Sequence, residues 1–385
     1  MTVAPLSQDE LDEIYAFAVD LGRKAGNLLM ERVDQRISGA NGDSNTFEEK
    51  ENAVDIVTQT DEDVEVFIRG ALESRYPTHK YVISLRQVAA KLTEFPRRFL
   101  GEEAYAKGQS RDYLIDEQPT WCIDPLDGKL APPQTLPSPN YQYKRGNVHH
   151  KRHKVTPPNP GTVNYTHIFP MFCVSIGFIV QHKPIIGVIY APFTNQLWSA
   201  CSGRGAWLNE TRRLPLIHNP IPPMPANAPS QCIFSCEWGK DRRDIPDGNM
   251  HRKIESFVNM AAEVGGRDGK GAMVHGMRSL GSATLDLAYV AMGSFDIWWE
   301  GGCWEWDIAA GAAILLEAGG LMTTANPPQD VDTAPIEDVR LGSRLYLAIR
   351  PAGPSATETG RETQERTARE VWRRVRTLDY SRPGA

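Results

Sequence analysis

The sequence contains no apolar run long enough to span a bilayer, and its N-terminus has no basic segment followed by an apolar one. We therefore expect neither a membrane-spanning segment nor a secretory signal, and we expect the cytoplasm as the location. Cysteine is scarce, with six residues in 385, and the cysteines lack the spacing of a zinc site. This usage predicts reduced, mostly buried thiols.

The sequence also lacks a strong charge balance of either sign. Its formal net charge is only −6, so nothing draws the whole molecule toward nucleic acid or an acidic membrane surface, and neither is expected as a partner. Apolar residues make up 41% of the chain and charged residues 23%, which is typical of a soluble globular protein. The length of 385 residues is sufficient for about two domain-sized cores.

Hydrophobic periodicity predicts helices at residues 8–33 and 61–76, the second ended by Pro77. Two apolar runs at 172–180 and 185–190, separated by a short polar stretch, are typical of a β-hairpin. We expect an N-terminal α+β half at residues 1–219, a C-terminal half of alternating helices and strands at 220–350, and a polar tail with a helix at 351–385.

Four carboxylates stand in short motifs: Glu102 in Phe-Leu-Gly-Glu-Glu, Asp124 and Asp127 in Asp-Pro-Leu-Asp, and Asp307 in Trp-Glu-Trp-Asp. Oxygen ligands select hard cations, so acids that converge with few nitrogen or sulfur donors favour Mg2+ over Zn2+. In Asp-Pro-Leu-Asp the proline fixes a turn, which lets both aspartates face one place. That arrangement suits two metal ions that share a ligand, a common solution for the hydrolysis of phosphate esters.

The Asp-Pro-Leu-Asp motif is interrupted. Trp121 to Gly128 resumes at Thr162 to Tyr165, and the joined pieces read W-x-I-D-P-L-D-G-T-x-N-Y. This pattern resembles the signature of the inositol monophosphatase family of Mg2+-dependent phosphatases. Four further segments resemble family motifs in the same order: Lys50 to Asp61, Gly276 to Ala283, Trp299 to Asp307, and Glu317 to Gly320.

The resemblance covers nearly the whole chain apart from the tail and two inserts. It implies an α+β fold, the layered α-β-α-β-α sandwich of the inositol monophosphatase and fructose-1,6-bisphosphatase type, with the metals between its two halves. It also implies inhibition by lithium, and relatives are commonly homodimers. The activity it implies is in-line attack of metal-activated water on phosphorus, without a phosphoenzyme.

Metal ligands follow from the same resemblance. Glu102, Asp124 and the carbonyl of Leu126 would hold a first Mg2+, and Asp124, Asp127 and Asp307 would hold a second. Glu102 would therefore belong to the catalytic centre.

The resemblance also implies roles in catalysis and substrate binding. Asp61 and Thr162 would orient and deprotonate the attacking water, and the amides of Gly128 and Thr162 would bind the phosphate. The substrate-binding residues it implies are Asp127, Gly128, Thr162, Gly281, Ser282, Ala283, Glu300 and Asp307.

Some of these residues have simpler interpretations. Asp61, before an expected helix, could be only an N-cap, and Glu300 could pair with a neighbouring base. The tryptophan cluster at residues 298–306 favours packing over base stacking.

The stretch from residue 129 to 161 has seven prolines, six Lys or Arg and no acid, a composition that does not favour a packed element. A basic arm that binds RNA or another anion is one reading. We hypothesise instead that residues 129–161 and 82–98 correspond to retained introns of a gene model, whose size would fit a filamentous fungus. Gly128-Lys129 can be encoded with a splice-donor sequence, and Leu92-Thr93 with a branch point.

The sequence thus predicts a Mg2+-dependent phosphatase for a small polyol phosphate monoester, with myo-inositol 1-phosphate as the first candidate. A 3′-phosphoadenosine nucleotide or histidinol phosphate is the alternative substrate within this superfamily. The split motif leaves open a catalytically inert binding protein that keeps the fold.

Overall fold

The structure is a computed structural model that describes residues 6–38, 49–83, 115–127, 163–238 and 241–380. Its first sheet has the strand order β1-β2-β3-β4-β5-β6-β7, in which only β1 and β2 run parallel and every other neighbouring pair is antiparallel. The strands are β1 (Lys80–Ile83), β2 (Thr120–Asp127), β3 (Cys173–Val180), β4 (Lys183–Ala191), β5 (Gln196–Cys201), β6 (Gly205–Leu208) and β7 (Arg212–Arg213).

A second sheet forms from the C-terminal half in the order β11-β12-β10-β8-β9. Strand β8 runs parallel to both β9 and β10, whereas β12 runs antiparallel to both β10 and β11. The strands are β8 (Ile233–Ser235), β9 (Gly276–Arg278), β10 (Ile297–Gly301), β11 (Leu321–Thr323) and β12 (Leu345–Ile349).

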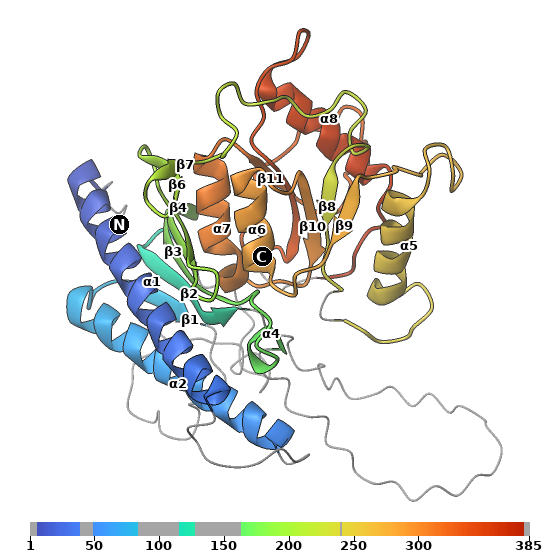
Figure 1. Cartoon of the computed structure of the whole chain (residues 1–385). Helices are drawn as coiled ribbons and strands as arrows, with labels where there is room; N and C mark the ends of the chain where they lie inside the picture. The colour runs from blue at the N-terminus through green and yellow to red at the C-terminus, as the bar shows by residue number, and fades with distance from the viewer. Residues whose placement is uncertain (1–5, 39–48, 84–114, 128–162, 239–240, 381–385) are drawn as a thin grey trace, which may run out of the picture.

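The helices make the other layers of the molecule, as Figure 1 shows. Helices α1 and α2 cover one face of the first sheet, α6 and α7 lie between the two sheets, and α5 and α8 lie on the far side of the second sheet. Their bounds are α1 (Gln8–Ile37), α2 (Glu49–Arg75), α4 (Val163–Thr166), α5 (Asn249–Ala261), α6 (Ala283–Met292), α7 (Glu305–Glu317) and α8 (Gly360–Trp372). The fold is the expected layered α-β-α-β-α sandwich.

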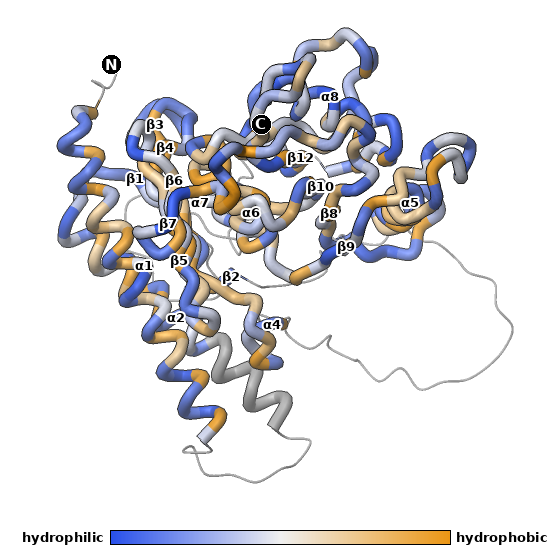
Figure 2. The backbone as a smooth tube through the Cα atoms, turned by 45° about the horizontal axis from the view of Figure 1, so that its top comes forward, coloured by the Kyte–Doolittle hydropathy of each residue, from blue (hydrophilic) through white to orange (hydrophobic). Residues whose placement is uncertain are grey.

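The central layer is apolar because α7 is covered on both sides. Along α1 hydrophilic and hydrophobic residues alternate, whereas α7 is mostly hydrophobic (Figure 2). Residues 308–315 of α7 are all buried. Packing against β4 is so close that a Cβ added at Gly187 would lie 2.2 Å from the carbonyl oxygen of Ala310, so glycine is required there.

Two expected helices are longer in the structure than the sequence pattern indicated. Helix α1 begins after Ser7, whose side chain forms a capping box with Glu10, and continues to Ile37. Helix α2 begins at Glu49, twelve residues before Asp61. Asp61 is therefore in the interior of a helix, and the N-cap interpretation of this residue is wrong. Within the described parts of the chain, no helix combines the length and apolarity needed to cross a bilayer.

The C-terminal segment packs into the second half of the molecule. Ala368, Val371 and Trp372 of α8 are buried in one cluster with strands of the second sheet. Beyond the helix, Tyr380 lies against Gly301 and Gly302, where an added Cβ would come within 2.9 Å of its ring. The backbone N–H of Asp241 donates to its hydroxyl at 3.3 Å. The tail is thus part of the core.

Candidate active site

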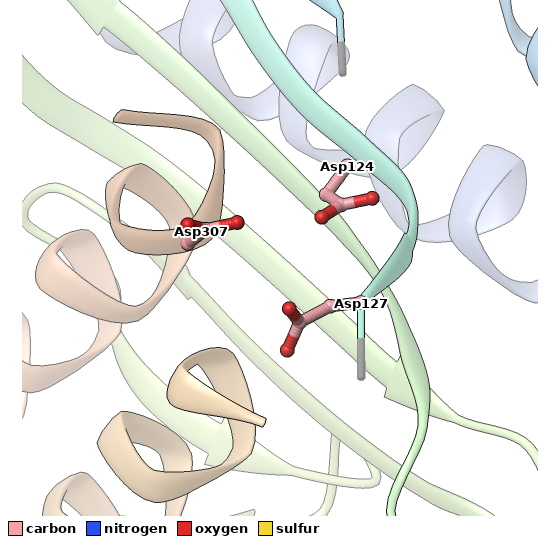
Figure 3. A group of neighbouring side chains, drawn as sticks. All are labelled: Asp124, Asp127 and Asp307. Atoms are coloured by element: carbon pink, nitrogen blue, oxygen red, sulfur yellow. The ribbon is translucent and has the colours of Figure 1, made fainter. Parts of the chain in front are cut away.

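A bulge near the end of β2 determines where its two aspartates point. Asp124 stands opposite Ser175 of β3, and Asp127 stands opposite Cys173, so three steps along β2 match two steps along β3. In a regular strand, residues three apart point to opposite faces. The extra residue, in the Pro-Leu pair between the aspartates, corrects this alternation. Both carboxylates therefore face the same side of the sheet, as Figure 3 shows.

Asp307 reaches the same place from the first turn of α7. Its Oδ2 accepts a hydrogen bond from the backbone N–H of Trp304 at 2.8 Å, so the side chain caps the helix that carries it. An acid in the first helical turn is favoured by the positive end of the helix dipole. The hydroxyl of Thr284 donates to the Asp307 carbonyl at 2.9 Å, which fixes the start of α7 to the start of α6.

The three aspartates form one cluster. Oxygens of Asp124, Asp127 and Asp307 lie within 4.8 Å of one another, and each residue is at most 5% exposed. Figure 3 shows the three carboxylates directed toward a common centre. Like charges at this spacing repel strongly away from water, and a divalent cation between them removes that cost. The donors are all oxygen, so the residues present fit Mg2+.

Cys173 stands opposite Asp127 in the sheet and is fully buried. Burial, reinforced by the charges of Asp127 and Asp124, raises the pKa of its thiol well above the ordinary value. The Cys173 thiol therefore holds its proton more tightly beside these carboxylates than an exposed cysteine does.

Ser282 connects the cluster to helix α6. It is the N-cap of that helix, and its Oγ accepts from the backbone N–H of Leu285 at 3.2 Å while its hydroxyl donates to Asp127. Gly281 before it has a φ of +75°, a conformation that suits glycine. The predicted residue Ser282 is thus placed beside a metal-ligand candidate, and Ala283 follows as the first residue of the helix. Substrate contacts of Gly281, Ser282 and Ala283 stay predictions.

Two contributors to the site were not predicted from the sequence. Thr284 donates its backbone N–H to Asp127 at 3.3 Å in addition to its bond with α7, and its position after the predicted Gly-Ser-Ala segment could have signalled this. Glu237 accepts hydrogen bonds from the backbone N–H groups of Leu280 and Gly281 at 2.6 and 2.8 Å. No local sequence signal indicates that contact, because it joins residues more than forty positions apart.

Glu300 is engaged inside the protein. It lies on β10, is 1% exposed, and forms an ion pair with Lys253 of α5. Its carboxylate also accepts from the backbone N–H groups of Glu237 and Gly301, each at 2.8 Å. The simpler interpretation, a pair with a neighbouring base, describes these contacts, and a role in substrate binding stays a prediction.

The remaining predicted residues are not all placed. Asp61 is on α2 and only 4% exposed, and its neighbour Thr60 is buried as well. Leu126 is fully buried between the two aspartates of β2. Glu102, Gly128 and Thr162 lie outside the described residues.

Comparison with known proteins identifies relatives of this chain along nearly its whole length. The model of the inositol monophosphatase family matches residues 10–129 and 148–376. The protein named qutG from Emericella nidulans is 66% identical over 380 residues, with 98% of each chain covered. Quinic acid degradation cluster protein x from Neurospora crassa is 59% identical over 394 residues, with 100% of each covered. Inositol monophosphatase 2 from Saccharomyces cerevisiae is 31% identical, over 96% of this chain and 97% of its own.

Among solved structures, inositol monophosphatase from Anabaena superimposes with a TM-score of 0.56 and 24% sequence identity. The match covers 96% of this chain and 99% of that one, so the whole architecture is shared. The match to the family model breaks between residues 129 and 148, inside the segment that we hypothesise to be an intron.

Proposed function

The chain belongs to the inositol monophosphatase family, and we propose that it is a Mg2+-dependent phosphatase that hydrolyses the phosphate monoester of a small polyol. Family membership supports a phosphoric monoester hydrolase. One observation supports the metal-dependent mechanism most: Asp124, Asp127 and Asp307 converge, buried, where the N-termini of α6 and α7 meet. An inert relative would have no need to keep three like charges together away from water.

The chain's own residues would bind the cation and the phosphate. Asp124, Asp127 and Asp307 would hold Mg2+, which when bound supplies a Lewis acid that activates water and neutralises charge on the leaving oxygen. The positive ends of the α6 and α7 dipoles lie at the same point and favour a phosphate anion there. Asp61 would accept the proton of the attacking water, oriented with the help of Thr162, and Glu102 would complete the ligand set.

The substrate we propose first is myo-inositol 1-phosphate. A second candidate comes from the name of the relative from Neurospora crassa, which refers to quinic acid degradation. Quinic acid is a cyclohexane polyol that carries a carboxylate, so its phosphate ester belongs to the same class of substrate. The two candidates differ in one negative charge on the ring, and direct comparison of their turnover distinguishes them.

The register of the first sheet supports the hypothesis about residues 82–98. Val82 and Ile83 are the last residues of β1 and stand opposite Cys122 and Ile123 of β2. In a chain without residues 82–98, Phe99 and Leu100 would follow Tyr81 and take these two positions. Because β1 and β2 are parallel, Glu102 would then come level with the end of β2, beside the aspartates, where the predicted ligand is needed.

Similar reasoning applies to residues 129–161. Asp127 accepts from Ser282, and Asn164 of α4 donates to the carbonyl of Leu280 at 2.9 Å, so both ends of the gap are fixed to one turn. In the shortened chain only Gly128, Thr162 and Val163 would lie between Asp127 and Asn164. A catalytic threonine in such a short link is held more accurately than one at the end of a long loop, and an error of about 1 Å can cost on the order of a hundredfold in rate.

The test is phosphate release from myo-inositol 1-phosphate with and without Mg2+. We expect the chain that lacks residues 82–98 and 129–161 to turn over with Mg2+ at least about a hundredfold faster than the full chain. Asp124→Asn in the shortened chain should abolish release. Activity of the full chain alone would show that both inserts are functional, and cDNA that retains both segments would reject the intron hypothesis. Release only from 3′-phosphoadenosine or histidinol phosphate would change the substrate class.

A further inference from the structure

Lys253 is a buried charge that the proposed reaction does not use. It lies on α5 with only 2% of its side chain exposed, and its ammonium group pairs with Glu300 of β10. It also donates to the carbonyl oxygen of Glu237 at 2.7 Å. Burial lowers the pKa of this lysine. The charge and hydrogen bond of Glu300, with smaller contributions from Cys236 and Tyr380, together outweigh that effect, so the pKa lies above its usual range and the group is charged.

Glu237 links this pair to the turn before α6. Its backbone N–H donates to Glu300 at 2.8 Å, so Lys253 and Glu300 together hold both polar groups of its peptide backbone. Its carboxylate accepts from the N–H groups of Leu280 and Gly281 at 2.6 and 2.8 Å, and from the hydroxyl of Ser279 at 2.8 Å. One side chain therefore fixes three donors of the turn.

The next residue in that turn is Ser282, whose hydroxyl donates to Asp127. The direction of this hydroxyl depends on the backbone of the turn, because Ser282 is the N-cap of α6 and Gly281 before it is in a left-handed conformation. A continuous series of hydrogen bonds and peptide bonds thus runs from Lys253 through Glu237 to the carboxylate of Asp127.

We propose that Lys253 is a positioning residue for the metal centre. It neutralises Glu300, fixes the backbone of Glu237, and through the Glu237 carboxylate holds the turn that orients Asp127. The inference rests on the proposed role of Asp127 as a metal ligand. Partners that orient metal ligands without binding the metal typically change metal affinity by ten- to a hundredfold when they are removed.

The experiment measures Mg2+ binding by titration calorimetry on the full chain, without substrate. Lys253→Met should weaken Mg2+ binding about tenfold or more, and Lys253→Arg, which keeps a cation, should recover part of the affinity. Because Lys253→Met leaves Glu300 buried without its cation, it could fail to fold. The double variant Lys253→Met with Glu300→Gln removes both charges, and we expect it to fold and to bind Mg2+ as weakly.

Arg350 offers a matched control. It is a largely buried cation next to the same sheet, directly after β12, and it pairs with Asp296 and donates to the carbonyls of Pro222 and Pro223. Arg350→Met should lower the melting temperature and leave Mg2+ affinity unchanged.

The outcomes separate this inference from the proposed function. Mg2+ binding by the wild-type chain with unchanged affinity in the folded double variant would overturn the role of Lys253 and leave the metal centre in place. Equal weakening in Arg350→Met would show a general loss of stability instead of positioning, which also overturns it. Absence of Mg2+ binding both by the wild-type chain and by the chain that lacks residues 82–98 and 129–161 would overturn the metal centre, and the inference with it.

Discussion

The replacement Ser282→Ala tests whether the N-cap of α6 orients Asp127 in the carboxylate cluster. The hydroxyl does two things: it caps the helix by accepting from Leu285 N–H, and it donates to Asp127. Loss of an N-cap costs about 1 kcal/mol of folding free energy. Loss of an orienting bond to a metal ligand costs roughly ten- to a hundredfold in metal affinity.

The two effects can be measured separately. Ser7→Ala is the matched control, because Ser7 is also a serine N-cap and accepts from the N–H of Glu10, but it caps α1 at the other side of the molecule. We expect urea unfolding to show a loss of about 1 kcal/mol for each variant. Calorimetric Mg2+ affinity should fall only for Ser282→Ala, and Ser282→Thr, which keeps a hydroxyl, should restore most of it. Equal Mg2+ affinity in Ser282→Ala and wild type would refute the reasoning.

Three further predictions concern charge and packing. Asp124→Asn should raise the melting temperature of the metal-free protein, because it removes one of three mutually repelling charges. Mg2+ should stabilise this variant less than it stabilises the wild-type chain. Scanning calorimetry with and without Mg2+ checks both expectations. Burial, with the charge of Glu237 adding to it, raises the pKa of Asp286 well above its ordinary value, so the folded state binds this proton more tightly than the unfolded chain does. Its contribution to stability is full below the ordinary carboxyl pKa and is lost as pH rises toward the raised one, so Asp286→Asn should gain stability relative to wild type between pH 5 and pH 8 in urea unfolding. Gly187→Ala should destabilise the protein by at least about 1–3 kcal/mol, because the added methyl group clashes with α7. Gly70→Ala, in a helix with open space around it, should stabilise the protein by about 0.5–1 kcal/mol. The denaturation midpoint should therefore fall for the first variant and rise for the second, and shifts of the same sign would contradict this reasoning.

The sequence alone predicted the parts of the site that are encoded locally. Asp124 and Asp127 are close in sequence, and their motif indicated that they face one place; the structure adds the bulge that makes this possible. Asp307 came from a motif that resembles the family, and it joins the same cluster. The layered architecture followed from the family resemblance more than from periodicity, whereas the strand order comes from the structure.

Long-range pairing explains what was missed. Lys253 and Glu300 are 47 positions apart, and nothing in their local sequences indicates that α5 and β10 place them together. The same holds for Glu237 and the turn at Gly281. The tail is polar in composition, yet most of its apolar residues are buried against strands of the second sheet: Ala368, Val371 and Trp372 of α8, and Val375, Leu378 and Tyr380 beyond it.

The packing of Tyr380 against Gly301 and Gly302 implies an order in which the two halves fold during synthesis. These glycines directly follow Glu300, so the strand that pairs with Lys253 is covered by a residue that lies almost eighty positions later in the sequence. Domains fold progressively from the N-terminus as they are synthesised. Here the first sheet and its helices can form early, but the second half cannot close until Tyr380 has left the ribosome. In a nascent chain the three aspartates of the cluster would therefore be synthesised before the fold that surrounds them is complete.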